Sequence, residues 1–212
     1  MREAILIGGG GHARVLAAIA RRDAACALVG YADVEDRGVR DGLVYLGPDA
    51  DLAVRYPDHA LLLGVGLMLN AAARWRLFCG LRDPGGRFLS LVATTAGVAD
   101  GVRLGAGSVV LDRAVINPGA VLGEACIVNT GAIVEHDCRL GDNVHVAPGA
   151  VVCGGVTVGS HCLIGAGAVL VPGVTVAAGT VVGAGAAVVR DLAPAGTYVG
   201  VPAVRRGEGM PG

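Results

Sequence analysis

Aliphatic residues recur at every sixth position through the second half of the chain. The series runs from Val98 to Val188 without an exception or an insertion. A period of six fits neither an α-helix, which repeats every 3.6 residues, nor a flat strand, which repeats every 2. It is typical of a hexapeptide solenoid, in which each hexapeptide forms one short strand and one turn. The positions are Val98, Leu104, Val110, Ile116, Leu122, Val128, Val134, Leu140, Val146, Val152, Val158, Ile164, Leu170, Val176, Val182 and Val188.

A second series lies four residues after each aliphatic position and holds small residues or valine, apart from its last member. Three hexapeptides make one triangular coil, with the large aliphatic residue inside and the small one beside a corner. Three cysteines occupy the small position, so we expect them to be buried as small hydrophobic residues. The series is Val102, Ser108, Ala114, Ala120, Cys126, Ala132, Cys138, Val144, Ala150, Val156, Cys162, Ala168, Val174, Thr180, Ala186 and Leu192.

The first ninety residues alternate between apolar runs typical of strands and amphipathic runs typical of helices. Alternating β and α elements favour a parallel sheet with helices on its faces. The chain therefore divides into an α/β domain (1–90), a β-helix domain (91–192) and a C-terminal tail (193–212). Within the first domain we expect strands over 4–8, 26–33, 42–47, 59–66 and 87–92, and helices over 12–22, 48–51 and 70–81.

A glycine-rich turn, IGGGGHARV (7–15), joins the first expected strand to the first expected helix. Gly8, Gly10 and Ala13 fit the dinucleotide-binding pattern GxGxxG/A. Asp33 ends the next strand, where a ribose-binding carboxylate would stand. Backbone amides at a helix N-terminus bind phosphate well, because the helix dipole favours negative charge there. The segment holds about one of the two βαβαβ halves of a dinucleotide domain, so we expect a nucleotide-sugar or mononucleotide site rather than an NAD site. The alternative is that the glycines only form a tight strand-to-helix turn and bind no ligand.

Composition excludes several classes of function. The net charge is −1 and aromatic residues make up 3%, so neither a nucleic-acid surface nor an anionic-membrane surface is indicated. All 17 basic residues are arginine, which excludes a lysine Schiff base and a Walker lysine. The six cysteines show no CxxC pair and no His/Cys ligand spacing, so we expect no metal. No signal peptide or membrane-spanning run is indicated, and we expect a reduced, cytoplasmic protein.

The two halves together resemble the family of sialic-acid O-acetyltransferases and nucleotide-amino-sugar N-acetyltransferases. The resemblance implies a small Rossmann-like α/β domain followed by a left-handed parallel β-helix, assembled as a homotrimer with active sites between neighbouring helices. It also implies acetyl transfer from acetyl-CoA to the amino group of a nucleotide-linked 4-amino-deoxy sugar, in surface glycan biosynthesis. The likeness covers nearly the whole chain and rests on IGGGGHARV (7–15), YAD (31–33), LGVG (63–66), NTGAIVEHDC (129–138) and GVPA (200–203).

Individual residues take roles from the same resemblance. The family's catalytic histidine matches His136, and the acidic residue beside it matches Asp137. A neutral imidazole can take the proton that a sugar amine loses as the C–N bond forms, and a carboxylate on the other ring nitrogen would fix its tautomer. Three ionisable residues, EHD (135–137), inside an apolar stretch favour a site independently. The acetyl-CoA contacts match His145, Gly154, Ala166 and Ala184, and the nucleotide contacts match Gly10, Gly11, His12, Asp33 and Gly66.

Two departures and two alternatives remain at this point. Val34 stands where the family often has a second acidic residue, and VATTAG (92–97) stands where it often has His-Pro. O-acetylation of sialic acid or a related sugar is one alternative, and a non-enzymatic nucleotide-sugar-binding solenoid is another. A carbonic anhydrase on the same helix fold would need a close HxxxxH pair, which the spacing of His136, His145 and His161 does not give. The sequence does not choose among UDP, GDP and dTDP.

Overall fold

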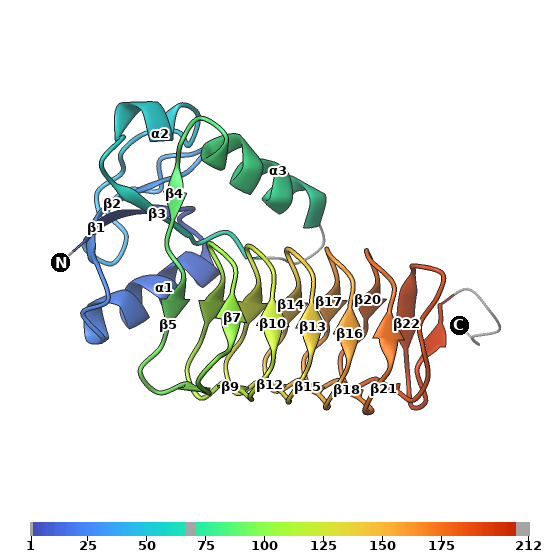
Figure 1. Cartoon of the computed structure of the whole chain (residues 1–212). Helices are drawn as coiled ribbons and strands as arrows, with labels where there is room; N and C mark the ends of the chain where they lie inside the picture. The colour runs from blue at the N-terminus through green and yellow to red at the C-terminus, as the bar shows by residue number, and fades with distance from the viewer. Residues whose placement is uncertain (1, 67–70, 207–212) are drawn as a thin grey trace. The chain divides into compact units, whose positions relative to one another are not determined.

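The computed structural model describes residues 2–66 and 71–206. They form two compact units, and the division falls between Ala93 and Thr94. The first unit is an α/β sandwich and the second is a parallel β-helix (Figure 1). No helix within the described residues is both long enough and apolar enough to cross a membrane.

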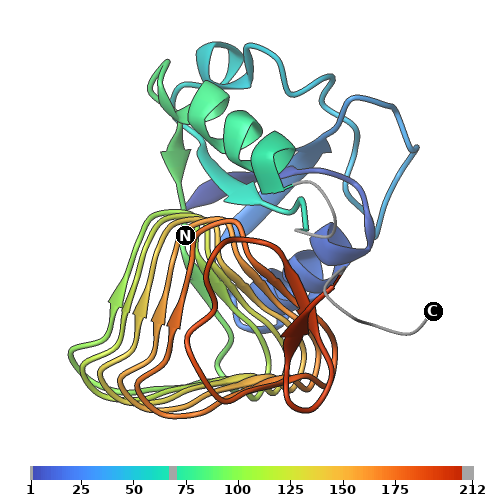
Figure 2. The same ribbon diagram turned by 90° about the vertical axis from the view of Figure 1, so that its right-hand side faces the viewer.

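The α/β unit is built on a four-stranded parallel sheet. Its strands are β1 (Glu3–Ile7), β2 (Ala27–Ala32), β3 (Ala60–Leu63) and β4 (Arg87–Phe88), in the order β2-β1-β3-β4. The central strand β1 is buried from Ala4 onward, as expected for a parallel strand that is covered on both faces. One face is covered by α1 (Gly11–Arg22), and the other by α2 (Leu52–Arg55) and α3 (Ala71–Arg82) (Figures 1 and 2).

Two of the expected elements of this unit are wrong. Residues 42–47 form only isolated bridges, Arg40 to Leu43 and Tyr31 to Tyr45, instead of a strand. The expected helix over 48–51 does not form, and α2 begins at Leu52, four residues after Pro48. Asp51 has a φ of 58°, in the left-handed region, so it stands before the helix and cannot continue one from Pro48.

Close packing sets the end of β3. The expected strand over 59–66 stops at Leu63, because Gly64 lies against both β1 and α1. An ideal Cβ at Gly64 would be 2.7 Å from the carbonyl oxygen of Ile7 and 2.9 Å from the Cβ of Ala13. Only glycine allows the helix and strand to approach this closely. Of the expected helix over 70–81, Asn70 lies outside the described residues.

Three parallel sheets form the walls of the β-helix. In the register, Val121 pairs with Arg103 on one side and Arg139 on the other, so each coil takes three hexapeptides, as the sequence period predicts. The six-stranded sheet is β6 (Gly97–Val98), β9 (Val115–Ile116), β12 (Ile133–Val134), β15 (Val151–Val152), β18 (Val169–Leu170) and β21 (Ala187–Val188). The five-stranded sheet is β7 (Arg103–Leu104), β10 (Val121–Leu122), β13 (Arg139–Leu140), β16 (Thr157–Val158) and β19 (Thr175–Val176).

The third sheet completes each coil and closes the C-terminal end. It contains β8 (Val109–Val110), β11 (Ile127–Val128), β14 (His145–Val146), β17 (Leu163–Ile164), β20 (Val181–Val182), β22 (Thr197–Val199) and the antiparallel β23 (Val204–Arg205). The last two strands lie in the region expected to be a tail. The short strand β5 (Leu91–Val92) precedes the division between the units. Viewed along the stack, the coils superpose as flat-sided loops (Figure 2).

The interior of the β-helix follows the two sequence series. The aliphatic positions from Val110 to Val188 are buried, and the small positions stack beside them. The three cysteines of that series are fully buried, as expected. Burial raises the pKa of the Cys138 and Cys162 thiols, so both stay neutral packing groups. The Sγ of Cys138 lies 3.1 Å from the carbonyl oxygen of Cys153 in the next coil.

Candidate functional site

The glycine turn of the α/β unit opens onto a cavity of about 620 Å³. All five residues expected to contact a nucleotide line it: Gly10, Gly11, His12, Asp33 and Gly66. Helix α1 has no acidic residue in its first turn, so no carboxylate neutralises the positive end of the helix dipole there. Its last turn holds two arginines. An ideal Cβ at Gly10 or Gly11 would meet nothing within 4 Å. The backbone amides are therefore open to an anionic ligand.

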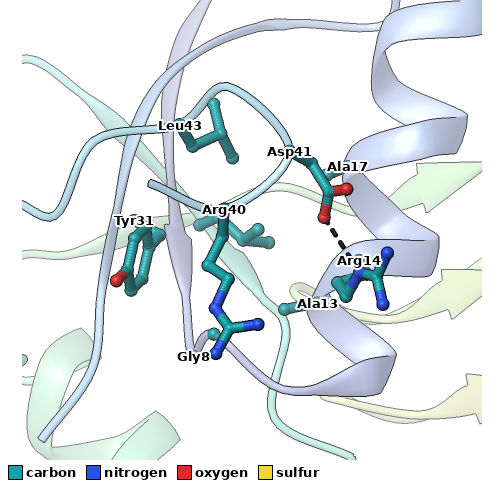
Figure 3. A pocket seen from close by; sticks show the side chains of 10 residues that line it. Gly8, Ala13, Arg14, Ala17, Tyr31, Arg40, Asp41 and Leu43 are labelled. Carbon is teal, nitrogen blue, oxygen red and sulfur yellow. Dashed lines mark hydrogen bonds and ion pairs between the residues drawn. The ribbon is translucent and has the colours of Figure 1, made fainter. Parts of the chain in front are cut away.

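A second pocket on the same turn is too small for a ligand. It has a volume of about 10 Å³ and lies between α1 and the loop that carries Arg40 and Asp41 (Figure 3). An ion pair of 3.1 Å between Arg14 Nε and Asp41 Oδ2 lies at its border. This volume holds about one water molecule, so the larger cavity is the candidate nucleotide site.

Asp33 connects the end of β2 to the glycine turn. Its Oδ2 accepts a hydrogen bond of 2.8 Å from the Gly9 N–H and another of 3.0 Å from Arg37 Nε. Burial alone would raise the pKa of the Asp33 carboxyl, but these two donors and the positive charge of Arg37 outweigh it and lower the pKa below its usual value. The carboxylate therefore holds the turn in place as well as facing the cavity.

Replacing Asp33 by asparagine is expected to destabilise the α/β unit by about 1–2 kcal/mol at pH 7. Because the folded-state pKa is lowered, the stabilisation is complete above the unfolded-state value of about 3.9 and is lost as pH falls through the folded-state value. The difference between wild type and D33N should therefore shrink at low pH. Urea unfolding followed by the single tryptophan, Trp75 in α3, measures it. A difference that does not change with pH would contradict this role of the Asp33 charge.

Two arginines in the cavity wall were not predicted from the sequence. Arg37 reaches the wall through its hydrogen bond with Asp33, and Arg74 comes from α3. The side chain of Arg74 is only 2% exposed, and its Nε donates a 2.7 Å hydrogen bond to the carbonyl oxygen of Val65. Gly66, next to Val65 in the chain, lies against His12, whose Cβ is 3.4 Å from an ideal Cβ at Gly66. No sequence pattern distinguishes these arginines from the others, because only the tertiary structure brings them to the cavity.

His136 and Asp137 form a hydrogen-bonded pair at a corner of the β-helix. They follow β12, and His136 Nδ1 lies 2.9 Å from Asp137 Oδ2. A neutral imidazole that donates Nδ1–H to the carboxylate leaves Nε2 free to accept a proton. The side chains are 64% and 74% exposed, so the pair is open to a substrate. The geometry has the form of a general base with an orienting carboxylate.

Glycines one coil away make room for this pair. An ideal Cβ at Gly154, in the coil after that of His136, would be 2.5 Å from the Nε2 of this histidine. An ideal Cβ at Gly119, in the coil before that of Asp137, would be 2.5 Å from Asp137 Oδ1. The role of Gly119 was not predicted, although the coil repeat marks the position. Glu135 takes no part in the pair, because its Oε2 accepts a 2.8 Å hydrogen bond from Asn117 Nδ2.

His145 lies on the third sheet, away from this corner. Its Nε2 is 3.0 Å from Asn129 Nδ2, and the Oδ1 of the same amide accepts the Thr130 N–H at 2.8 Å. The amide orientation is thus fixed, and Nε2 of His145 is the acceptor, which places the proton of a neutral ring on Nδ1. His161 is half-buried, and its Nδ1 lies 3.3 Å from Asn143 Nδ2.

The remaining two predicted residues lie at a different corner from His136. Ala166 and Ala184 occupy the same place in successive coils, where Gly185 N–H donates to the Ala166 carbonyl oxygen at 2.8 Å. This corner precedes the strands of the six-stranded sheet, whereas the His136 corner follows them. Within one chain, the structure therefore brings His136, Asp137 and Gly154 together at one corner. Ala166 and Ala184 lie at another corner of the same chain.

Among the described residues, no three His, Cys, Asp or Glu side chains are grouped so that they could hold a metal ion. The candidate chemistry rests on the His136–Asp137 pair and on backbone amides.

The hexapeptide β-helix and the comparisons that follow place the chain among the acyltransferases. A family model, Bacterial transferase hexapeptide (six repeats), matches residues 119–154. The acetyltransferase domain of PglB from Neisseria gonorrhoeae FA1090 is 32% identical, with a TM-score of 0.89, and the match covers 97% of this chain and 100% of that one. The chain belongs to the hexapeptide-repeat nucleotide-amino-sugar N-acetyltransferases.

Two further solved structures extend the comparison. A histidine-to-asparagine variant of perosamine N-acetyltransferase from Caulobacter crescentus, in complex with CoA and GDP-perosamine, is 35% identical with a TM-score of 0.91, and the match covers 98% of each chain. WeeI from Acinetobacter baumannii AYE is 24% identical with a TM-score of 0.84, over 96% of this chain and 99% of that one, and shows the fold alone. The comparison with curated proteins gives no match.

Proposed function

We propose that this protein transfers the acetyl group of acetyl-CoA to the amino group of a nucleotide-linked 4-amino sugar, with His136 as the general base. The observation that carries the proposal is the His136–Asp137 pair, with Nε2 directed over Gly154. Relatives support the two substrates, since the PglB domain was also solved with acetyl coenzyme A and the Caulobacter enzyme with GDP-perosamine. We also predict that the protein is cytoplasmic and acts in surface glycan biosynthesis.

In the proposed reaction the sugar amine attacks the thioester carbonyl carbon. The new C–N bond forms as His136 Nε2 takes the amine proton, and Asp137 stabilises the resulting imidazolium. The C–S bond then breaks, and the imidazolium returns the proton to the CoA thiolate. A backbone N–H in the adjacent turn, that of Gly154, is the proposed donor to the oxyanion. The products are an amide and free CoA.

The α/β unit is proposed to hold the nucleotide diphosphate at the N-terminus of α1. Substituting Gly10 or Gly11 by alanine places a methyl group where the ligand would lie, in space that is open in the structure. We expect GDP affinity, measured by calorimetry, to fall about tenfold or more. The free energy of unfolding should stay constant or rise slightly in G11A, since alanine favours helix more than glycine, and should fall slightly in G10A, since Gly10 is the N-cap of α1. Unchanged affinity in both variants would contradict the assigned phosphate position.

A homotrimer is proposed because the site is incomplete in one chain. Of the predicted acetyl-CoA residues, Gly154 lies at the edge that follows the six-stranded sheet, whereas Ala166 and Ala184 lie at the edge that precedes it, so a second copy must bring one edge to the other. That sheet presents an aliphatic outward column, whereas the five-stranded sheet presents two arginines, two threonines and one valine. Sedimentation equilibrium should give three times the chain mass of 21.0 kDa, and a monomer would contradict the shared site. The outward column is Val115, Ile133, Val151, Val169 and Ala187.

The test of the proposed function is thiol release from acetyl-CoA with GDP-, UDP- and dTDP-linked 4-amino sugars. Turnover with one nucleotide series supports the proposal and identifies the nucleotide. Turnover with a sialic acid but with none of the amines would replace it by O-acetylation. Nucleotide binding without any turnover would replace it by a binding solenoid.

A further inference from the structure

Asp49 lines the larger cavity of the α/β unit, and neither the proposed reaction nor the phosphate position uses it. The other carboxylate in the cavity wall, that of Asp33, is occupied by the Gly9 N–H and by Arg37 Nε. Asp49 is half-buried, and within residues 2–66 and 71–206 no group donates a hydrogen bond to its carboxylate. The oxygens of Asp49 are therefore available to hydrogen-bond donors of a bound ligand.

The order of segments at the carboxyl edge of the sheet places Asp49 far from the glycine turn. Strand β1 leads into the glycine turn, and its neighbour β2 leads to Asp33. Beyond β2 the chain runs parallel to it again, since Tyr31 N–H donates to the Val44 carbonyl oxygen at 3.0 Å and Leu46 N–H donates to the Tyr31 carbonyl oxygen at 2.8 Å. With about 4.8 Å between neighbouring strands, this segment lies about 10 Å from β1. The glycine turn, Asp33 and Asp49 therefore follow one another across the edge.

The loop that carries Asp49 is held in place by Arg55 of α2. The guanidinium of Arg55 donates to the carbonyl oxygen of Leu46 at 2.9 Å and also to that of Pro48. Between them, Gly47 has a φ of 104°, and an ideal Cβ there would be 3.1 Å from Arg55 Nη1. Both observations favour glycine at this position. The cavity wall around Asp49 is thus fixed by the fold before any ligand binds.

The three parts of a nucleoside diphosphate match this order. The N-terminus of α1 suits the diphosphate, and a carboxylate at the end of the second strand suits the ribose. Asp49 then lies where the base would be, at the far end of the cavity. Val34 and Leu77 line the same cavity and supply apolar surface for the faces of a heterocyclic ring.

A carboxylate distinguishes the bases by their hydrogen-bonding edges. Guanine presents two adjacent donors, N1–H and the N2 amino group, and a carboxylate can accept both in parallel. Uracil and thymine present one donor, N3–H, between two carbonyl oxygens that a carboxylate repels. Adenine and cytosine place a ring-nitrogen acceptor beside their amino group. Guanine is therefore the base whose edge fits Asp49.

We propose that Asp49 accepts hydrogen bonds from N1–H and the N2 amino group of guanine, so that the substrate is a GDP-linked amino sugar and not a UDP- or dTDP-linked one. This inference rests on the proposed nucleotide site at the glycine turn. A site built to accept donors from one ligand discriminates strongly against ligands that lack them, because its own polar groups would then be left unpaired. The choice of nucleotide comes from a side chain outside the glycine pattern.

The test measures nucleotide affinities by calorimetry without acetyl-CoA. For the wild type we expect GDP to bind about tenfold to a hundredfold more tightly than UDP or dTDP, and about tenfold more tightly than inosine diphosphate, which lacks the N2 amino group. In D49N the ratio of GDP to inosine diphosphate affinity should fall to about threefold or less, because a single amide oxygen cannot pair with two donors side by side. D58N, which removes an exposed carboxylate outside the cavity, should keep the wild-type ratios. Urea unfolding reports whether each variant folds.

The outcomes separate this inference from the proposed function. A wild type that prefers UDP or dTDP, or binds GDP and inosine diphosphate equally, overturns the guanine site and leaves acetyl transfer to another nucleotide sugar intact. This comparison needs no variant. Wild-type ratios in D49N, or an equal loss for every nucleotide, also overturn it, because Asp49 would then not read the base. A preference for GDP that depends on Asp49, without turnover of any amino sugar, supports the guanine site and removes the proposed reaction. A wild type that binds no nucleotide overturns the nucleotide site and this inference together.

Discussion

Replacing His136 by alanine is expected to lower kcat by about 10²–10⁴-fold and to leave the fold unchanged. The imidazole is 64% exposed and its ring contributes little to the core, so the loss should fall on proton transfer and not on stability. The affinity for acetyl-CoA should change little, since the base acts in the transition state. Steady-state thiol release and calorimetric CoA binding measure the two quantities separately.

His161 offers the matched control for this experiment. It also stands at a coil corner, but at a different one from His136, and its backbone is left-handed with a φ of 64°. H161N should retain kcat within about threefold, because asparagine tolerates the left-handed conformation. Equal rates for wild type and H136A would remove the base from the mechanism, whatever the control shows.

Replacing Gly154 by alanine is expected to lower kcat about 10²-fold, although the added group is a single methyl. The new Cβ would be 2.5 Å from His136 Nε2 and 2.7 Å from its Cε1, so the ring must move. A displacement of about 1 Å at a reacting group costs about this much. Glycine is not required here for backbone conformation, since Gly154 is not among the residues with positive φ. The effect should therefore be specific to the imidazole.

Gly97 provides the control for the added methyl group. It also lies in the β-helix without a positive φ, and the nearest atom to its ideal Cβ is Val115 Cγ2 at 4.0 Å. G97A should keep both kcat and the melting temperature. The double variant H136A/G154A should be no slower than H136A alone, since both changes remove the same group. Additive losses would show that Gly154 acts independently of the imidazole.

The β-helix could be predicted from the sequence because the residues that pair between adjacent coils lie three hexapeptides apart in the chain. Once each coil takes three hexapeptides, a position predicts its neighbours above and below, as Gly154 and Gly119 show for His136 and Asp137. The small interior positions of Cys126 and Cys162 follow in the same way. No comparable period exists in the α/β unit, where each element must be inferred from its own short pattern.

The errors in the α/β unit have local causes. Pro48 suggested a helix start, but the left-handed backbone of Asp51 delays the helix to Leu52. The glycine turn and Asp33 could be predicted to lie together because the GxGxxG/A pattern and an acidic residue after the next strand are visible in the sequence, and both line the larger cavity. Arg37 and Arg74 were missed, since their place in the cavity depends on side-chain contacts with Asp33 and the Val65 carbonyl oxygen.

The most direct test of the central claim is the identity of the acetylated product. Wild-type protein would be incubated with acetyl-CoA and a GDP-linked 4-amino sugar, and the product analysed by mass spectrometry before and after hydroxylamine treatment. Hydroxylamine cleaves esters and leaves amides intact. We predict a mono-acetylated nucleotide sugar that resists hydroxylamine, formed with one equivalent of free CoA. A hydroxylamine-sensitive product, or CoA release without acetylated sugar, would contradict N-acetyl transfer.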